Sequence, residues 1–485
     1  MVQTARKRSR RRPRNWSILT RLGGYVLAFG GLIGVFMKTW LLTYWDSLRS
    51  NFWFVPSLMV AGSVLLSFLT LWLDQRPETG RIASAALTYS RGPEGARAIL
   101  SAVAGSMVTI ASLTFSITIV TLQLASSQFG PRILRSFVRD RGNQVVLGTF
   151  ISTFTYCLLV LRAVNGTDEN EFVPHLSVII ALLLTLASLG VLIYFIHHTS
   201  YSIQAETVVD SVGRDLREAI DRLFPEKLGK DAAAAGRAPS AASLPAGYEA
   251  GSRPVPANVS DYLQNLDGER LLELATEKDL VLRVEHRPGR FIVEGQDLVR
   301  VWPSSRLDDE LTEAIRGAFY FGSRRTLMQD TGFAVDQLVE VAVRALSPGI
   351  NDPFTAVACL DRLGASLSRL AGRETPSAHR FDEGGQLRVV TEVTSMAGLA
   401  DAAFHQIRQA ARTNAAVTLR LLETIAVILP FVRVATFRES LLRHAALVHE
   451  GSQEGLPSAS DRREAAERYR AIFQELPSGD SGPIG

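Results

Sequence analysis

Cysteine is scarce in this chain, which holds two in 485 residues. Cys157 lies in an apolar run and Cys359 in a helical pattern, so their separation fits neither a disulfide framework nor a cysteine-rich metal site. We expect both to be packing residues. The eight histidines are scattered as well, and we therefore predict no metal site and no cofactor.

Motifs for catalysis are missing too. The sequence has no G-x-x-x-x-G-K-[ST] run for phosphate, no H-E-x-x-H pair for zinc, and no serine or cysteine in a nucleophile motif. The net charge of +4 is small for this length and gives no general case for nucleic acid as a partner. We therefore predict a protein that is not an enzyme and that binds no nucleic acid.

Charged residues are absent from the depth of four long apolar stretches, all of them before Tyr201. About 20 helical residues cross a hydrocarbon layer of roughly 30 Å, so each stretch is a candidate membrane span. A proton or sodium relay normally needs an ionisable group within the membrane, which disfavours coupled transport. The predicted spans are residues 52–73, 100–127, 145–161 and 173–196.

The N-terminus is basic and precedes an ambiguous hydrophobic segment. Residues 1–16 form a basic tail without acids, which should attract anionic lipid and stay in the cytoplasm. Within residues 17–50, the stretch from 25 to 45 is hydrophobic and Gly-rich, is interrupted by Lys38, and ends with Tyr44 and Trp45. A fifth span here would place either the basic N-terminus or the basic loop after the second span outside the cytoplasm. We therefore predict an interfacial or re-entrant segment.

The loop charges orient the predicted transmembrane domain, residues 51–200. The loop after the second span carries Arg132, Arg135, Arg139 and Arg141 against Asp140, which predicts a cytoplasmic position. The next connection is acidic and suits the outside. Four spans then place both termini in the cytoplasm.

The second span is unusually polar. At about 100° per residue, one helical face collects small and polar residues, while Ile110, Ile117 and Leu124 lie opposite. Polar groups in lipid need partner helices or water, so this face either packs against neighbours or lines an aqueous path. The face contains Ser101, Gly105, Thr109, Ser112, Ser116, Gln123 and Ser127.

Thr109, Ser112, Ser116, Gln123 and Ser127 are our candidate pore-lining residues. Gly130 and Pro131 should end the helix. Arg132 and Arg135 follow at the predicted cytoplasmic mouth, where they either raise the local anion concentration or act as ordinary membrane anchors.

The C-terminal half divides by composition into further segments. Residues 201–227 have the spacing of an amphipathic helix that continues the last span, and residues 228–256 are an Ala-, Gly-, Ser- and Pro-rich linker. We predict a small β module for residues 257–304, a cytoplasmic helical domain for residues 305–476, and a disordered tail for residues 477–485.

The stretch ALSPGINDPFTAV carries explicit signals for the end and the start of a helix. Ser347-Pro348-Gly349 should end one helix, Asp352 suits the N-cap of the next, and Pro353 its first position. We interpret it as a helix-turn-helix connection. The functional alternative is a ligand or anion site at Asn351 and Asp352, where the new helix exposes backbone N–H groups.

Two long motifs resemble one family. The combination SLTFSITIVTLQLASSQFGPRILRSFVRDRGNQVVLGTF with VAVRALSPGINDPFTAV is similar to predicted bacterial inner-membrane proteins catalogued as a domain of unknown function. The resemblance covers most of residues 50–450. It implies a multi-pass plasma-membrane protein with a cytoplasmic C-terminal region, and it supplies no substrate.

The sequence therefore predicts an α-helical multi-pass membrane protein with a mainly helical cytoplasmic domain that contains a small β module. Two functions remain open. The first is a homo-oligomeric ion channel or pore, lined by the polar face of the second span and gated by the cytoplasmic domain. The second is a non-conducting scaffold or sensor whose cytoplasmic domain binds a protein or a small ligand, with the hydroxyls used for helix packing.

Overall fold

The computed structural model describes residues 53–76, 92–132, 140–165, 172–224 and 244–474. Several predictions fall outside these ranges: the basic tail, the segment 17–50, most of the linker, the C-terminal tail and Arg135. The chain forms two compact units. Met1–Val120 and Arg135–His198 form the four-helix unit, and Thr121–Leu134 and Thr199–Gly485 form the C-terminal unit.

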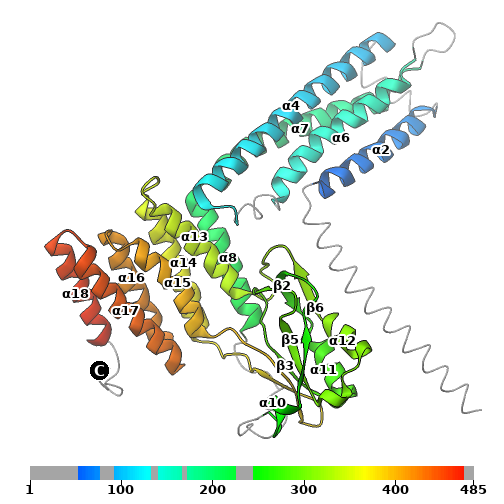
Figure 1. Cartoon of the computed structure of the whole chain (residues 1–485). Coiled ribbons are helices and arrows are strands. Elements are labelled where there is room, and N and C mark those ends of the chain that lie inside the picture. The colour runs from blue at the N-terminus through cyan, green and yellow to red at the C-terminus, as the bar shows by residue number, and fades with distance from the viewer. Residues whose placement is uncertain (1–52, 77–91, 133–139, 166–171, 225–243, 475–485) are drawn as a thin grey trace, which may run out of the picture. The chain divides into compact units, whose positions relative to one another are not determined.

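The four predicted spans are all helices that are long and apolar enough to cross a membrane (Figure 1). Their bounds lie close to the predicted ones, and α4 begins earlier than expected because PEGARAI extends its N-terminus. The helices are α2 (Phe54–Asp74), α4 (Pro93–Phe129), α6 (Arg141–Ala163) and α7 (His175–Ser202).

Close contact between α2 and α6 depends on a glycine. A Cβ on Gly148 would lie 2.5 Å from the Met59 sulfur and 3.2 Å from the Pro56 Cα, so a larger residue would require the Met59 side chain and the α2 backbone to shift. Further along, the Thr70 and Tyr156 hydroxyls are 2.9 Å apart. Buried polar groups of this kind are stable because each finds a partner.

Asp74, the last residue of α2, caps the start of α7. Its carboxylate accepts hydrogen bonds from the backbone N–H groups of Leu176 and Ser177, both at 2.9 Å, and from the Ser177 hydroxyl at 2.7 Å. The first N–H groups of a helix have no partner within the helix, and a carboxylate there also opposes the positive end of the helix dipole.

The amphipathic helix α8 (Ala205–Leu223) is separate from α7. The backbone of Gln204 is extended, which ends the helical path, so the expectation of one continuous helix is wrong. Its buried side does follow the predicted spacing, with Val208, Val212, Leu216 and Ile220 all buried. This side packs against helices α13 (Thr331–Ala345) and α14 (Pro353–Ala371).

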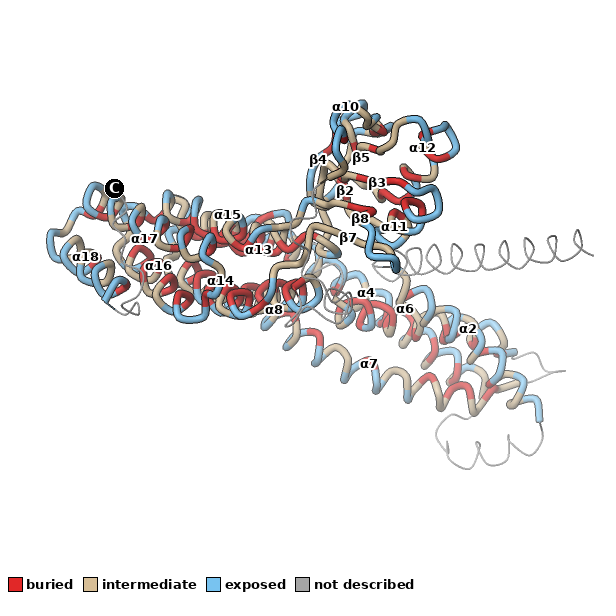
Figure 2. The backbone as a smooth tube through the Cα atoms, turned by 90° about the horizontal axis from the view of Figure 1, so that it is seen from below, coloured by how far each residue is buried: buried red, intermediate tan, exposed pale blue. Residues whose placement is uncertain are grey.

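The β module holds two small sheets, and its strands come from a wider range than residues 257–304 (Figure 2). One sheet has the order β1-β5-β3-β8-β7, with β1 (Arg253–Pro256), β5 (Asp297–Trp302), β3 (Val281–Val284), β8 (Leu387–Val390) and β7 (His379–Phe381). The other has the order β4-β2-β6, with β4 (Phe291–Ile292), β2 (Asp261–Leu266) and β6 (Phe319–Gly322).

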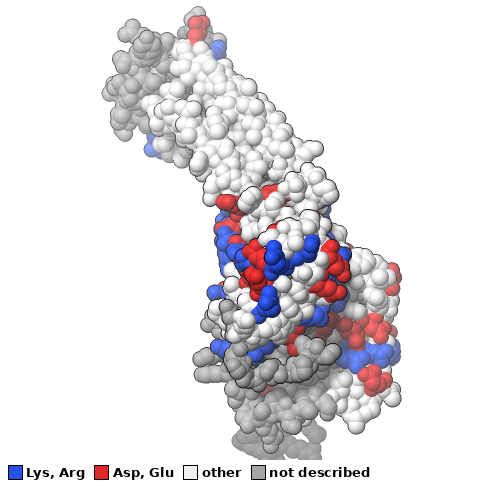
Figure 3. Space-filling model, turned by 90° about the vertical axis from the view of Figure 1, so that its left-hand side faces the viewer, with Lys and Arg blue, Asp and Glu red and all other residues white. Residues whose placement is uncertain are grey.

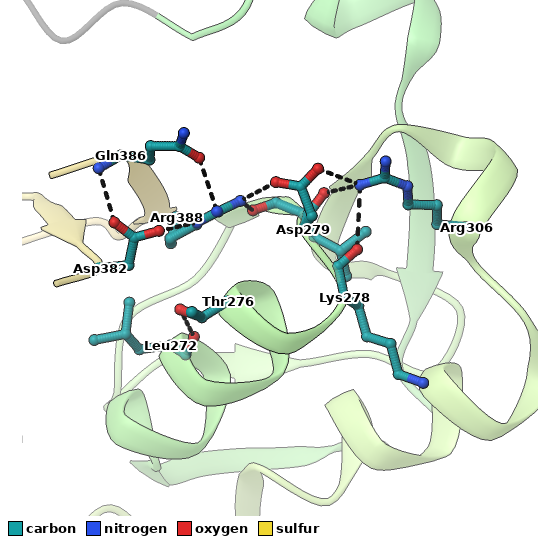
Figure 4. A network of polar contacts seen from close by, with 9 residues as sticks. Leu272, Thr276, Lys278, Asp279, Arg306, Asp382, Gln386 and Arg388 are labelled. Atoms are coloured by element: carbon teal, nitrogen blue, oxygen red, sulfur yellow. Dashed lines mark hydrogen bonds and ion pairs between the residues drawn. The ribbon is translucent and has the colours of Figure 1, made fainter. Parts of the chain in front are cut away.

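An arginine network joins the distant strand β8 to the rest of the module (Figure 4). Arg388 is buried and donates to Asp279 and Asp382, each at 2.7 Å, and to Gln386 at 2.8 Å. Asp279 also accepts from Arg306 at 2.7 Å. The buried guanidinium is thus matched by carboxylates, which is the condition under which a buried charge is tolerated.

The remaining part of the C-terminal unit is helical. Helices α11 (Gly268–Glu277) and α12 (Asp309–Arg316) belong to the β module, and a short turn, α10 (Tyr248–Gly251), precedes it. Helices α13 and α14 are followed by α15 (Met396–Ala410), α16 (Ala415–Ile428), α17 (Ala435–Gly455) and α18 (Ala459–Gln474). Their buried faces form a layered bundle in which α13 packs on α15, and α14 on α16.

Candidate functional site: the polar face of helix α4

Helix α4 buries one narrow face. Ala96 and Leu100 pack in a core with Tyr156 and Cys157, and Met107 packs in a second core with Phe150. Together with Ala104, these positions recur every three or four residues, as one helical face requires. The same neighbours bury Cys157, as its apolar surroundings in the sequence predicted.

The predicted polar face points away from these cores. All seven of its residues are exposed in the single chain, so no described part of the chain covers it. Exposed apolar residues flank it, Val108 on one side and Leu113 and Val120 on the other, and the exposed Ile119 falls within the face itself. The exposed polar residues are Ser101, Gly105, Thr109, Ser112, Ser116, Gln123 and Ser127.

Most hydroxyls on this face donate back to their own helix. Thr109 donates to the Gly105 carbonyl at 3.0 Å, and Ser116 donates to the Ser112 carbonyl at 2.9 Å. Each still has an oxygen that can accept a hydrogen bond from water or a neighbour. The Gln123 amide makes no hydrogen bond to the described part of the chain, which leaves both its donors and its acceptor available.

Helix α4 also extends past the start of α6. Met107 and Val146 belong to one buried core, and α6 begins about 8 Å before Val146. Within the four-helix unit α4 continues to Val120, about 20 Å beyond Met107. The stretch from about Ser116 to Val120 therefore extends beyond the first residue of α6.

The surface of the four-helix unit seen in Figure 3 is nearly free of Lys, Arg, Asp and Glu, and charges gather at its ends. One end carries a pair that the sequence did not reveal. Asp140 caps α6 by accepting from the Gly142 N–H at 2.8 Å, and its other oxygen contacts His198 Nε2 at the far end of α7. A Cβ at Gly142 would lie 2.8 Å from His198 Nε2, so a larger residue would displace the His198 ring.

The last turns of α4 belong to the C-terminal unit and dock on α13. Arg344 donates to the Ser127 carbonyl at 3.0 Å, and Gln337 donates to the Arg132 carbonyl at 3.3 Å. The Arg132 guanidinium pairs with Glu340 at 3.4 Å. Carbonyls at a helix C-terminus lack helical partners and carry partial negative charge, so the Arg344 cation suits this position.

Gly130 makes the docking sterically feasible. Helix α4 ends at Phe129, as the Gly130-Pro131 signal predicted, and Gly130 has a φ of +103°. A Cβ at Gly130 would collide with the Glu340 carboxylate, so the position requires glycine for both conformation and space. Arg132, a predicted mouth charge, thus has an acidic neighbour, while Arg135 lies outside the described residues.

The Asn351 and Asp352 site has a local explanation. Asp352 accepts from the Thr355 N–H at 3.2 Å and from the Thr355 hydroxyl at 2.5 Å, so its own carboxylate occupies the start of α14. Asn351 takes a left-handed conformation with φ of 50° to complete the turn. These contacts favour the helix-turn-helix interpretation. Among the described residues, no group of three or more His, Cys, Asp or Glu could hold a metal ion.

Comparison with known proteins gives the family. The profile described as "Predicted membrane protein (DUF2254)" matches residues 49–427. Uncharacterized proteins from Mycobacterium tuberculosis and Mycobacterium bovis are 31% identical over 427 residues, which cover 86% of this chain and 79% of each relative. No solved structure matches the chain significantly. The chain therefore belongs to this family of predicted membrane proteins, as its motifs at 112–150 and 341–357 indicated.

Proposed function

We propose that the protein is a homo-oligomeric ion channel or pore of the bacterial plasma membrane, with the α4 polar face along the conducting path. One observation carries the proposal: this face is turned away from the helices that the structure describes, and none of the described residues covers it. Copies arranged around an axis would bring their polar faces together and leave the apolar flanks against neighbouring helices or lipid.

Passive conduction fits the chemistry of the face better than coupled transport. Its side chains are hydroxyls and one amide, which can replace part of an ion's hydration shell without binding it tightly. The polar face also lacks the ionisable groups from which proton and sodium relays are built.

Gating is assigned to the C-terminal unit through α13. Arg344, Gln337 and Glu340 hold the end of the proposed pore helix, so a displacement of α13 would be transmitted to α4 directly. This assignment is compatible with cytoplasmic termini, which the basic loop after α4 supports through the positive-inside rule.

The second candidate is a non-conducting scaffold or sensor. The intrahelical hydrogen bonds of Thr109 and Ser116 favour it, because a hydroxyl that is satisfied by its own helix tolerates a helix interface or lipid without water. Gln123 opposes it, because an amide has more donors and acceptors than this helix satisfies.

Single-channel recording from purified protein in planar bilayers tests the proposal. Ser116→Leu and Gln123→Leu should each lower unitary conductance at least several-fold, because they place an apolar side chain in the path. Val120→Leu is the matched control on the exposed apolar flank and should leave conductance unchanged. A protein that does not conduct, or conductance indifferent to both changes, would contradict the assignment.

A further inference from the structure

A cavity of about 250 Å³ lies at one end of the helical bundle, among α15, α16 and α17. Sites between the helices of a bundle are common positions for small ligands. Its apolar side is formed by Leu421, Leu447 and Val448. Its polar side holds two arginines and two glutamates: Arg408, Arg412, Glu450 and Glu454.

The four charges of the cavity are not all paired. Arg412 forms an ion pair with Glu454. Arg408 and Glu450 form no ion pair with the described part of the chain. The two arginines lie on α15 or just after it and the two glutamates on α17, and one charge of each sign, Arg408 and Glu450, remains available to a ligand.

The Arg408 side chain also has an unsatisfied hydrogen-bond donor. Its Nε atom is buried and has no hydrogen-bond partner in the described structure. A buried donor without a partner destabilises the fold, and a carboxylate oxygen is the acceptor that a guanidinium binds best. The nearby hydroxyls of Thr418 and Ser452 already donate to the carbonyls of Ala411 and His449, so they offer only acceptor oxygens.

We propose that this cavity binds a small zwitterion of the amino-acid type. Its carboxylate would pair with Arg408, its ammonium group with Glu450, and an aliphatic side chain would cover Leu421 and Leu447. The combination of one free cation, one free anion and an apolar wall fits a zwitterion better than a simple anion. The proposal does not depend on conduction by α4.

Binding can be measured on the full-length protein in lipid nanodiscs by isothermal titration calorimetry and thermal unfolding. The probes are the 20 common amino acids, with propionate and propylamine as analogues that each lack one charge. At least one aliphatic amino acid should bind and raise the Tm, while both analogues should bind at least tenfold more weakly. No binding of any amino acid at 10 mM would overturn the proposal.

Variants identify the site. Arg408→Gln should weaken amino-acid binding at least tenfold, and Glu450→Gln, which changes an exposed side chain, should weaken it while leaving propionate binding intact. Arg470→Gln, on α18 outside the cavity, is the control and should bind as the unaltered protein does. Equal binding of propionate and amino acids, unaffected by Glu450→Gln, would show an anion site and refute the zwitterion assignment. Because binding is measured without current, its failure would leave the channel proposal untouched.

Discussion

At the scale of single residues, polar groups in this chain are positioned mostly by caps and short ion pairs. Asp74, Asp140 and Asp352 each satisfy the first N–H groups of a helix. Only Asp352 was identified as a cap from the sequence, because its Asp-Pro signal is local. Asp74 caps a helix more than 100 positions away, and no local pattern announces such a contact.

His444 gives the chain a predictable response to acid. Its ring is fully buried on α17, and Nε2 contacts the Asp401 carboxylate at 2.8 Å. Burial lowers the pKa of His444, although Asp401 favours the charged form. The unfolded chain therefore takes up this proton first as pH falls below about 6.5, and the folded state loses stability there.

The expected loss is at most about 1.4 kcal/mol per pH unit below that value. Chemical unfolding of the detergent-solubilised chain between pH 7.5 and 5.5 measures it. His444→Gln keeps a donor for Asp401 but removes the titration, so its stability should depend less steeply on pH. Gln406→Ala, at an exposed position on α15 that carries no titratable group, should keep the original slope. If the unfolding free energy depended on pH with the same slope in all three proteins, the pKa of His444 would not change on folding.

At the scale of elements, the junction of α4 with α13 connects the end of a predicted membrane span to the helical part of the C-terminal unit. Three α13 side chains hold the last turn of α4 and the residues after it, and glycine at position 130 admits one of them. The end of α4 was predictable from Gly130-Pro131. Its docking partner was not, because more than 200 positions separate Ser127 from Arg344.

Arg344→Ala should loosen this junction. A hydrogen bond from a partly exposed charged group is worth about 1 kcal/mol, so amide exchange in residues 121–129 should become roughly fivefold faster. If the junction gates the pore, the same change should alter open probability at constant unitary conductance. Arg362→Ala, which removes an exposed pair with Asp210 on α8, should not affect exchange in residues 121–129. Unchanged exchange in Arg344→Ala would exclude a stabilising role for the contact.

At the scale of the whole molecule, the face of α4 that the described residues leave uncovered is the surface on which we propose that further copies of the chain assemble. If α4 lines a pore, the number of copies is constrained, because a ring of α-helices about 10 Å wide leaves an axial opening only when it contains at least about four members. A scaffold has no such constraint.

We therefore expect four or more copies in native-like lipid. Light scattering or native mass spectrometry of the protein in nanodiscs gives the number. If the α4 polar face mainly borders water, Ser116→Leu should change the number of copies in the oligomer by no more than one. A monomer or a dimer in lipid would exclude a pore lined by α4 alone.

The sequence by itself determined the four spans, the polar stripe, the end of α4 and the family, since each depends on composition or on spacing within one segment. The tertiary structure decided which face of α4 the other helices cover, and that β8 joins β3 through Arg388. It also separated α7 from α8 and brought α15, α16 and α17 around one cavity. These features depend on contacts between distant segments, whose geometry is set by packing of the whole fold and not by any local pattern.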